Sequence, residues 1–165
     1  TGAAKCGGNY ASSLLPQQEA YANGCQQVAF LDASEHKYVE ELGGMNLYFV
    51  YSDGAIVTPA LSGSILEGIT RDSIMTLAGD LGHDVTERRI TLDEWRDGTA
   101  DGSIVEVFAC GTAAVVTPVG ALKWDGGQAV ASGSEASKVA HALRSALVDI
   151  QYGRAEDRHG WMVRV

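Results

Sequence analysis

A hairpin signal between residues 46 and 58 limits the folds open to this chain more than any other local feature. Residues 46–51 and 55–58 are rich in β-branched and aromatic side chains, and Ser52-Asp53-Gly54 lies between them. Since Asp-Gly favours a tight turn, we expect two adjacent antiparallel strands, with Pro59 ending the second. The fold should therefore contain a sheet with hairpin connections.

Further helix and strand patterns surround this hairpin. Helices are predicted from Ser12 or Ser13 to Asn23 and over residues 70–81, 92–96 and 134–153. Strands are predicted over residues 26–32, 38–42, 86–90, 104–108, 113–116, 121–124, 128–130 and 161–165. Because strands and helices are mixed and hairpins are frequent, we expect one α+β domain over residues 1–165, not an alternating parallel sheet.

Two of the predicted helices carry a single apolar stripe, which indicates a buried side. The stripe of the helix over residues 70–81 consists of Ile74, Leu77, Ala78 and Leu81. The stripe of the final helix consists of Val139, Leu143, Leu147 and Ile150. Both helices are expected to pack on the sheet.

Composition excludes some partners. With 165 residues and 45% hydrophobic content, the chain can bury a core of its own. A formal net charge of −9 argues against binding to nucleic acid or to an anionic membrane, because both would be repelled. The apolar runs are too short to span a bilayer and no signal peptide is recognisable, so we expect a soluble, cytoplasmic protein.

The cysteines and histidines suggest neither a disulfide framework nor a metal site. Three cysteines form no Cys-x-x-Cys pair, and four histidines are scattered without ligand spacing. Cys110 is interpreted as a buried inert thiol and not as a nucleophile, because no histidine is near it in sequence. His83-Asp84 could be a base and its orienting acid, but Gly82-His83-Asp84 is more typical of a helix exit.

Lys5 is the side chain with the most distinctive setting. It is one of four lysines and is followed by Cys6-Gly7-Gly8-Asn9-Tyr10, where a bulky molecule could approach its amine. Lysine forms Schiff bases with carbonyl compounds, pyridoxal phosphate (PLP) among them. The alternative is a solvated lysine close to a frayed terminus.

Three further segments gain meaning beside Lys5 and Tyr10. Glu41 precedes two glycines, where the backbone can approach a flat ring. Residues 66–71 open a helix and so offer unpaired N–H groups to an anion. Residues 110–113 are expected to form a tight turn with a hydroxyl donor. Each has a structural alternative: a solvated carboxylate, a plain helix start with Arg71 covering the helix surface, and a plain turn.

The motifs together resemble those of branched-chain amino acid aminotransferases, which are PLP enzymes of fold type IV. Lys5-Cys-Gly-Gly-Asn-Tyr-Ala-Ser-Ser-Leu-Leu-Pro-Gln resembles the lysine motif of that family. Glu41-Leu-Gly-Gly-Met-Asn, Gly68-Ile-Thr-Arg, Phe108-Ala-Cys-Gly-Thr-Ala and Asp149-Ile-Gln-Tyr-Gly follow in the family's order. The resemblance covers nearly the whole chain and corresponds to the family's larger, C-terminal domain.

The resemblance implies a role for each matching residue. Lys5 is similar to the lysine that forms the Schiff base, Tyr10 to the tyrosine beside the cofactor's phenolic oxygen, and Glu41 to the acid that pairs with the pyridine nitrogen. The remaining positions implied by the resemblance are Ile69, Thr70 and Thr112 for the phosphate, and Tyr10, Gly44, Thr112 and Ala113 for the substrate.

The implied reaction is transamination of leucine, isoleucine and valine with 2-oxoglutarate, in a pathway of branched-chain amino acid biosynthesis. The implied fold is the fold type IV large domain, like that of D-amino-acid aminotransferase, with mixed β-sheets or a pseudo-barrel and flanking helices. The chain begins at Thr1 without a methionine, and the resemblance implies that the family's small N-terminal domain is absent from it. A homodimer is implied, with that domain completing the site.

Two alternatives remain at this point. The same lysine and glutamate occur in D-amino-acid transaminases and aminodeoxychorismate lyases, and the chain could instead be an inactive fragment that retains only an assembly surface. Three departures from the family pattern are visible: Glu67 replaces a common proline, Gly44 replaces a common threonine, and Ala114 and Thr117 stand where some animal relatives carry a Cys-x-x-Cys.

Overall fold

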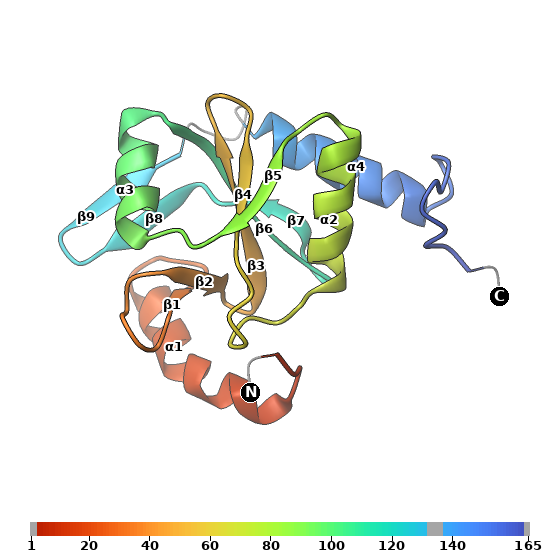
Figure 1. Cartoon of the computed structure of the whole chain (residues 1–165). Helices are drawn as coiled ribbons and strands as arrows, with labels where there is room; N and C mark the ends of the chain where they lie inside the picture. Colours follow the sequence, from red (N-terminus) through yellow and green to blue (C-terminus); the bar gives the residue numbers. More distant parts are fainter. Residues whose placement is uncertain (1–2, 132–136, 164–165) are drawn as a thin grey trace.

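Strand β3 (Met45–Tyr51) runs through the middle of the sheet in the computed structural model, which describes residues 3–131 and 137–163 (Figure 1). One edge of β3 pairs with β6 (Ile104–Gly111) from Asn46 to Tyr51. The other edge is divided, because β2 (Val39–Leu42) pairs with the start of β3 and β4 (Ile56–Pro59) with its end. β3 is therefore the strand that joins the two halves of the sheet.

The remaining strands and the helices complete the fold. Over the described residues the large sheet also contains β1 (Ala29–Leu31), β5 (Val85–Arg88) and β7 (Val115–Pro118), and a separate hairpin consists of β8 (Ala121–Trp124) and β9 (Gly127–Val130). The helical segments are the 3-10 helix η1 (Gly7–Ser13), α1 (Leu14–Ala22), α2 (Ile69–Asp80), α3 (Leu92–Asp101) and α4 (Lys138–Gln151). β4 and β5 are parallel and are joined through α2, whereas the other strand pairs are antiparallel.

Side chains on the two faces of the sheet form two separate cores. Because neighbouring residues of a strand point to opposite faces, Tyr48 and Val50 face one side and Leu47 and Phe49 the other. The first face is covered by α2 and α4, and the second by α3 and the β8–β9 hairpin (Figure 1). The expected α+β fold class, with mixed strands and flanking helices, is confirmed.

The predicted hairpins and apolar stripes are largely confirmed. β3 and β4 pair around a turn in which Gly54 has φ +92° and Asp53 accepts the N–H of Ala55. Of the expected stripes, the members Ile74, Leu77, Ala78, Leu143, Leu147 and Ile150 are buried. Leu81 is wrong as a stripe member, since it follows α2 as its C-cap and is 48% exposed.

Several predicted boundaries are wrong. α3 continues to Asp101, beyond the expected end at Arg96. β6 includes Cys110 and Gly111, so the turn to β7 occupies residues 112–114, and β7 starts later than the expected strand over 113–116. The expected helix start at Ser134 lies outside the described residues.

The expected strand over residues 161–165 is also wrong within its described part, residues 161–163. Trp161 instead stacks on His159, at 4.6 Å between ring centroids, and packs against the α2–α4 core. His159 lies 2.7 Å from the carboxylate of Asp80, the last residue of α2. Trp161 is thus partly buried by side-chain contacts without strand pairing, whereas Met162 and Val163 are exposed.

Arg71 does not cover the surface of α2, as the sequence suggested, but is 5% exposed in its first turn. Its guanidinium lies 2.9 Å from the Glu87 carboxylate on β5 and donates to the carbonyl of Pro59 at the end of β4. The hydroxyl of Tyr48 on β3 donates to the Arg71 carbonyl at 2.7 Å. Three strands therefore hold the start of α2.

Among the described residues, none of the helices combines the length and the apolar character needed to cross a bilayer.

Breaking the Arg71–Glu87 pair should destabilise the fold. Glu87→Gln leaves a buried guanidinium without its counter-charge, and because Glu87 is 39% exposed we expect a loss of about 2 kcal/mol, between the values for exposed and buried pairs. Asp93→Asn, which breaks the exposed Arg96–Asp93 pair, is the control and should cost less than about 0.5 kcal/mol. Urea unfolding of both variants measures the difference, and equal losses would contradict this role for Arg71.

Candidate active site

The turn between β2 and β3 places Tyr10 beside two glycines. Gly43 and Gly44 have φ +58° and +93°, a region that L-residues rarely adopt. A Cβ on Gly44 would lie 3.4 Å from the Tyr10 ring, and one on Gly43 would overlap the side chain of Gln27. Their positive φ favours glycine at both positions, and the structure brings the predicted residues Tyr10 and Gly44 together.

Glu41 is a half-buried carboxylate that is hydrogen-bonded to the loop containing Leu66. Its Oε1 accepts the N–H of Leu66 at 2.7 Å. Burial raises the pKa of Glu41, the Leu66 hydrogen bond opposes that rise, and the charge of Glu40 adds to it. Glu41 is therefore not the solvated strand carboxylate of the structural alternative.

Asn46 stands directly opposite Glu41 in the β2–β3 register. It is 7% exposed, and its Nδ2 donates to the carbonyl of Leu66 at 3.1 Å. The side chains of one cross-strand pair therefore bind both backbone groups of Leu66. A Cβ on Gly68, two residues further, would overlap Oδ1 of Asn46.

The start of α2 follows this loop and is open to solvent. Its N-cap, Gly68, has no side chain with which to cap the helix, and Ile69 is 86% exposed. Thr70 is half-buried. The first N–H groups of a helix lack intrahelical partners and attract anions, so the predicted residues Ile69 and Thr70 lie where an anion can bind.

The turn after β6 reaches the same end of β3. Asn46 pairs with Cys110, and Thr112 follows two residues after Cys110 in the turn that leaves β6. Thr112 and Ala113 are exposed in that turn. The predicted phosphate and substrate residues of this segment thus lie near the end of β3 where Asn46 pairs with Glu41 of β2.

Lys5 is exposed and precedes η1. Its segment is tied to the loop that carries Leu66, because the N–H of Ala3 donates to the carbonyl of Gly63 at 3.2 Å. The carbonyl of Ala4 accepts the side-chain amide of Asn9 at 2.8 Å. The lysine segment and the loop that holds Glu41 are therefore connected by backbone hydrogen bonding.

Residues 62–66 form a loop that two neighbouring glutamates bind. Ser62 and Ser64 donate to Oε1 of Glu40, at 2.9 and 2.5 Å, while Glu41 binds Leu66. Hydrogen bonds to charged acceptors are stronger than neutral ones. This loop, defined here as the 62–66 loop, is thereby fixed between β2 and the start of α2.

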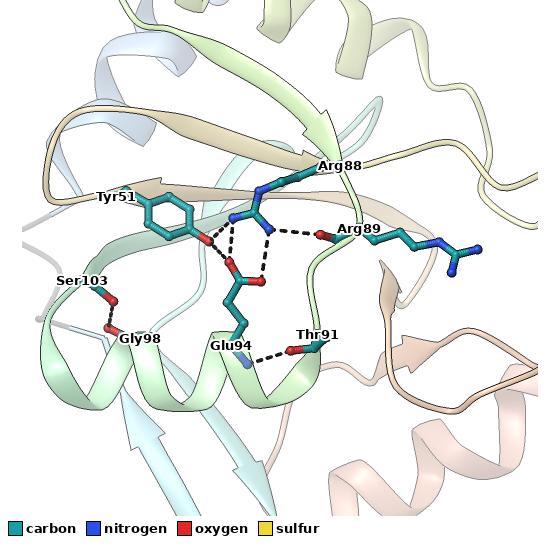
Figure 2. Close-up of polar contacts among 7 residues, drawn as sticks. All are labelled: Tyr51, Arg88, Arg89, Thr91, Glu94, Gly98 and Ser103. Carbon is teal, nitrogen blue, oxygen red and sulfur yellow. Dashed lines mark hydrogen bonds and ion pairs between the residues drawn. The ribbon is translucent and has the colours of Figure 1, made fainter.

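A second polar network lies at the opposite end of β3 and has a different character. Figure 2 shows Arg88 between Tyr51 and Glu94, with its Nη2 2.9 Å from the Tyr51 hydroxyl and 2.6 Å from Glu94 Oε1. Thr91 caps α3 by accepting the N–H of Glu94. Burial raises the pKa of Tyr51 to about 12, and Arg88 lowers the pKa of Glu94. Since these groups satisfy one another, the network fastens α3 to the sheet.

Comparison with known proteins identifies the family of this chain. Residues 3–122 match the family described as amino-transferase class IV. The chain belongs to that family. A probable branched-chain-amino-acid aminotransferase of Streptomyces coelicolor is 60% identical over 161 residues, and a branched-chain-amino-acid aminotransferase of Mycobacterium tuberculosis is 54% identical over 168.

These alignments cover 98% and 100% of this chain but 44% and 46% of the relatives, so the chain spans about half the length of the curated relatives it matches. A T.th. branched-chain amino acid aminotransferase complexed with N-(5'-phosphopyridoxyl)-L-glutamate superposes with a TM-score of 0.82 at 39% identity, covering 98% of this chain and 50% of the other. The Escherichia coli branched-chain enzyme gives a TM-score of 0.80 at 36% identity, with 99% and 51% covered. The predicted fold type IV is thereby confirmed.

Two minor sequence interpretations also hold in this class IV aminotransferase chain. Cys110 is fully buried, and burial raises the pKa of its thiol to about 12. His83 follows the end of α2 after Gly82, whose φ is +84°, and its Nδ1 lies 3.1 Å from the carbonyl of Gly54. Within residues 3–131 and 137–163, no three His, Cys, Asp or Glu side chains gather as a metal site would require.

Sequence reasoning missed the residues that hold Glu41. Asn46 had a signal, as a polar residue inside an otherwise apolar strand, and it was noted only as part of a motif. Leu66 acts through its backbone, which leaves no trace in side-chain chemistry. Glu40, Ser62 and Ser64 are ordinary surface residue types, and their meeting depends on tertiary structure.

The raised pKa of Glu41 predicts a pH-dependent stability. The folded chain binds this proton more tightly than the unfolded chain, so the stabilisation is present below the ordinary glutamate pKa and is lost as pH rises through the raised value. Glu41→Gln, which stays neutral, should therefore raise the melting temperature of the cofactor-free protein relative to the parent at about pH 7, and less so at about pH 4. Calorimetry at both pH values measures this, with Glu67→Gln, an exposed carboxylate nearby, as control. A difference that does not change with pH would contradict the burial of the Glu41 charge.

Proposed function

We propose that the protein carrying this chain transaminates leucine, isoleucine and valine with 2-oxoglutarate, using PLP. One observation carries the proposal: Glu41, the Tyr10–Gly44 contact, the open start of α2 and the Thr112 turn all lie at one end of β3. Relatives named branched-chain-amino-acid aminotransferase, 54–60% identical over nearly the whole chain, support the substrate class.

The residues present fit PLP in charge and in space. Glycines at 44 and 68 leave room beside Tyr10 and Asn46 that a Cβ would fill. A carboxylate, a helix start and a tyrosine hydroxyl match the ring nitrogen, the phosphate and the phenolic oxygen of PLP. In this proposal Lys5 binds PLP covalently, Tyr10 donates to its phenolic oxygen and Glu41 faces its ring nitrogen, and the phosphate is bound by Ile69 and Thr70 N–H groups with the Thr112 hydroxyl.

The chemistry divides between cofactor and chain. PLP, when bound, supplies an electron-withdrawing ring for the bond at the substrate α-carbon. Glu41, as a carboxylate, keeps a proton on the ring nitrogen. With PLP bound, the Lys5 amine would carry the proton from the substrate α-carbon to the cofactor carbon, and positioned acid–base catalysis of this kind contributes about two to four orders of magnitude.

Substrate binding and assembly extend the proposal. The amides of Thr112 and Ala113 face the substrate carboxylate, and an apolar pocket takes the branched side chain. We further propose that the chain is the cofactor-bearing C-terminal domain, which a smaller N-terminal domain completes, in a cytoplasmic homodimer. That the chain spans about half the length of its curated relatives supports the two-domain part of this proposal.

Covalent attachment at Lys5 is the first test. The protein, in the longest form its reading frame encodes, should be yellow when loaded with PLP, and borohydride should fix the cofactor to the peptide that contains Lys5. Lys5→Arg is the control and should abolish the adduct while keeping the positive charge. Peptide mass spectrometry reads the result, and an adduct on Lys37, Lys123 or Lys138 in its place would remove the mechanism.

Substrate preference separates the aminotransferases of this fold. Leucine, isoleucine and valine should be converted with 2-oxoglutarate, and D-alanine should not, since the supporting relatives are branched-chain enzymes. A coupled assay of glutamate formation measures each rate. Turnover of D-alanine alone would identify a D-amino-acid transaminase, and absence of all turnover in PLP-loaded protein would favour an inactive fragment.

A further inference from the structure

Asn46 is a buried polar side chain that neither the covalent nor the anion-binding part of the proposed function uses. It is 7% exposed near the start of an apolar strand, between Met45 and Leu47. A buried amide is costly unless its polar atoms are paired. Its position therefore calls for a specific partner, and the partner found is the backbone of Leu66.

Two side chains bind the backbone N–H and carbonyl of Leu66, as the backbone of a neighbouring strand would in an antiparallel sheet. The Leu66 N–H donates to Glu41 Oε1 at 2.7 Å, and its carbonyl accepts from Asn46 Nδ2 at 3.1 Å. Glu41 and Asn46 are themselves a register pair. If the Asn46 amide is lost, Leu66 is held at one end only and can rotate away from Glu41.

Leu66 also determines how the Glu41 carboxylate is oriented. Oε1 is committed to the Leu66 N–H, whereas Oε2 takes no hydrogen bond from the residues that the structure describes. One oxygen is fixed and the other is left for a ligand. Such an arrangement is what pre-organises a carboxylate for a single acceptor direction.

Gly68 leaves room for the Asn46 amide. The backbone of Gly68 has φ −70° and ψ 130°, which any residue adopts, so conformation does not require glycine here. A Cβ would overlap Asn46 Oδ1. Glycine at this position therefore leaves space for the Asn46 side chain, which contacts the loop and the start of α2 at once.

We propose that Asn46 is a positioning residue for Glu41: it holds the Leu66 backbone, and Leu66 holds the carboxylate toward the cofactor ring. This inference rests on the proposed function, because it assigns Glu41 to the ring nitrogen. Asn46 acts through two other residues and contacts neither cofactor nor substrate.

A double-mutant cycle on PLP affinity tests this role. Asn46→Ser should weaken PLP binding about tenfold when Glu41 is present, and by less than about twofold when Glu41→Gln is already in place, because coupled neighbours are not additive. PLP is titrated by absorbance into the longest encoded form of the protein. The control is Thr58→Val, which removes another buried hydrogen bond to β3, from Thr58 Oγ1 to the Leu47 carbonyl at 2.7 Å, and should leave PLP affinity unchanged.

Gly68→Ala approaches the same contact from α2. The added methyl group should displace the Asn46 amide and weaken binding about tenfold. Pyridoxal, which has no phosphate, serves as the second probe, because its affinity reports on the ring end without the anion site. The loss should persist with pyridoxal and should disappear when Asn46→Ser is present, since serine leaves room for the methyl group.

The outcomes distinguish failure of the proposed function from failure of the positioning role of Asn46. Absence of PLP binding in the unmodified protein would overturn the proposed function. Binding in the unmodified protein, with an equal loss from Asn46→Ser in both Glu41 backgrounds or a loss matched by Thr58→Val, would overturn the positioning role alone. A loss confined to the Glu41 background, repeated by Gly68→Ala, would establish it.

Discussion

The hold of Glu41 and Asn46 on the backbone of Leu66 is the contact on which the rest of the site depends. It joins β2 and β3, whose pairing supplies the two side chains, to the loop that leads into α2. Because a cross-strand pair has fixed spacing, the loop can dock in one register only. The distance between the carboxylate and the start of the helix is therefore set by the sheet and not by the loop.

The divided edge of β3 makes this docking possible. β2 pairs with the start of β3 and β4 with its end, and the chain that leaves β4 must cross the division before α2 begins. Thr58 satisfies the Leu47 carbonyl between the two paired stretches, while Arg71 ties the helix to β4 and β5. Buried polar groups of this kind are costly when unpaired, so each one specifies where an element must lie. Glu41 is also paired, with the Leu66 N–H, and burial still raises its pKa.

Most of the fold could be predicted from local sequence patterns. The Asp53-Gly54 turn, the stripes of α2 and α4 and the small hairpin near Trp124 were predictable, because each depends on residues close in sequence. The burial of Arg71 was not predicted, because its partner Glu87 lies on β5, a strand that follows α2 in the chain. Predicted site residues other than Lys5 lie near one end of β3, yet the groups that hold Glu41 were not predictable, since Leu66 contributes only its backbone. Both failures have the same cause, because the contacts concerned join residues that are far apart in the sequence.

The central claim is that Lys5 and Glu41 lie on opposite sides of one pyridine ring. A crystal structure of the protein grown with PLP tests it most directly. The account predicts continuous density from Lys5 Nζ to the aldehyde carbon of the cofactor, with Glu41 Oε2 at about 2.7–2.9 Å from the ring nitrogen and Oε1 still on the Leu66 N–H. A cofactor joined to another residue, or a ring nitrogen that faces solvent away from Glu41, would contradict it.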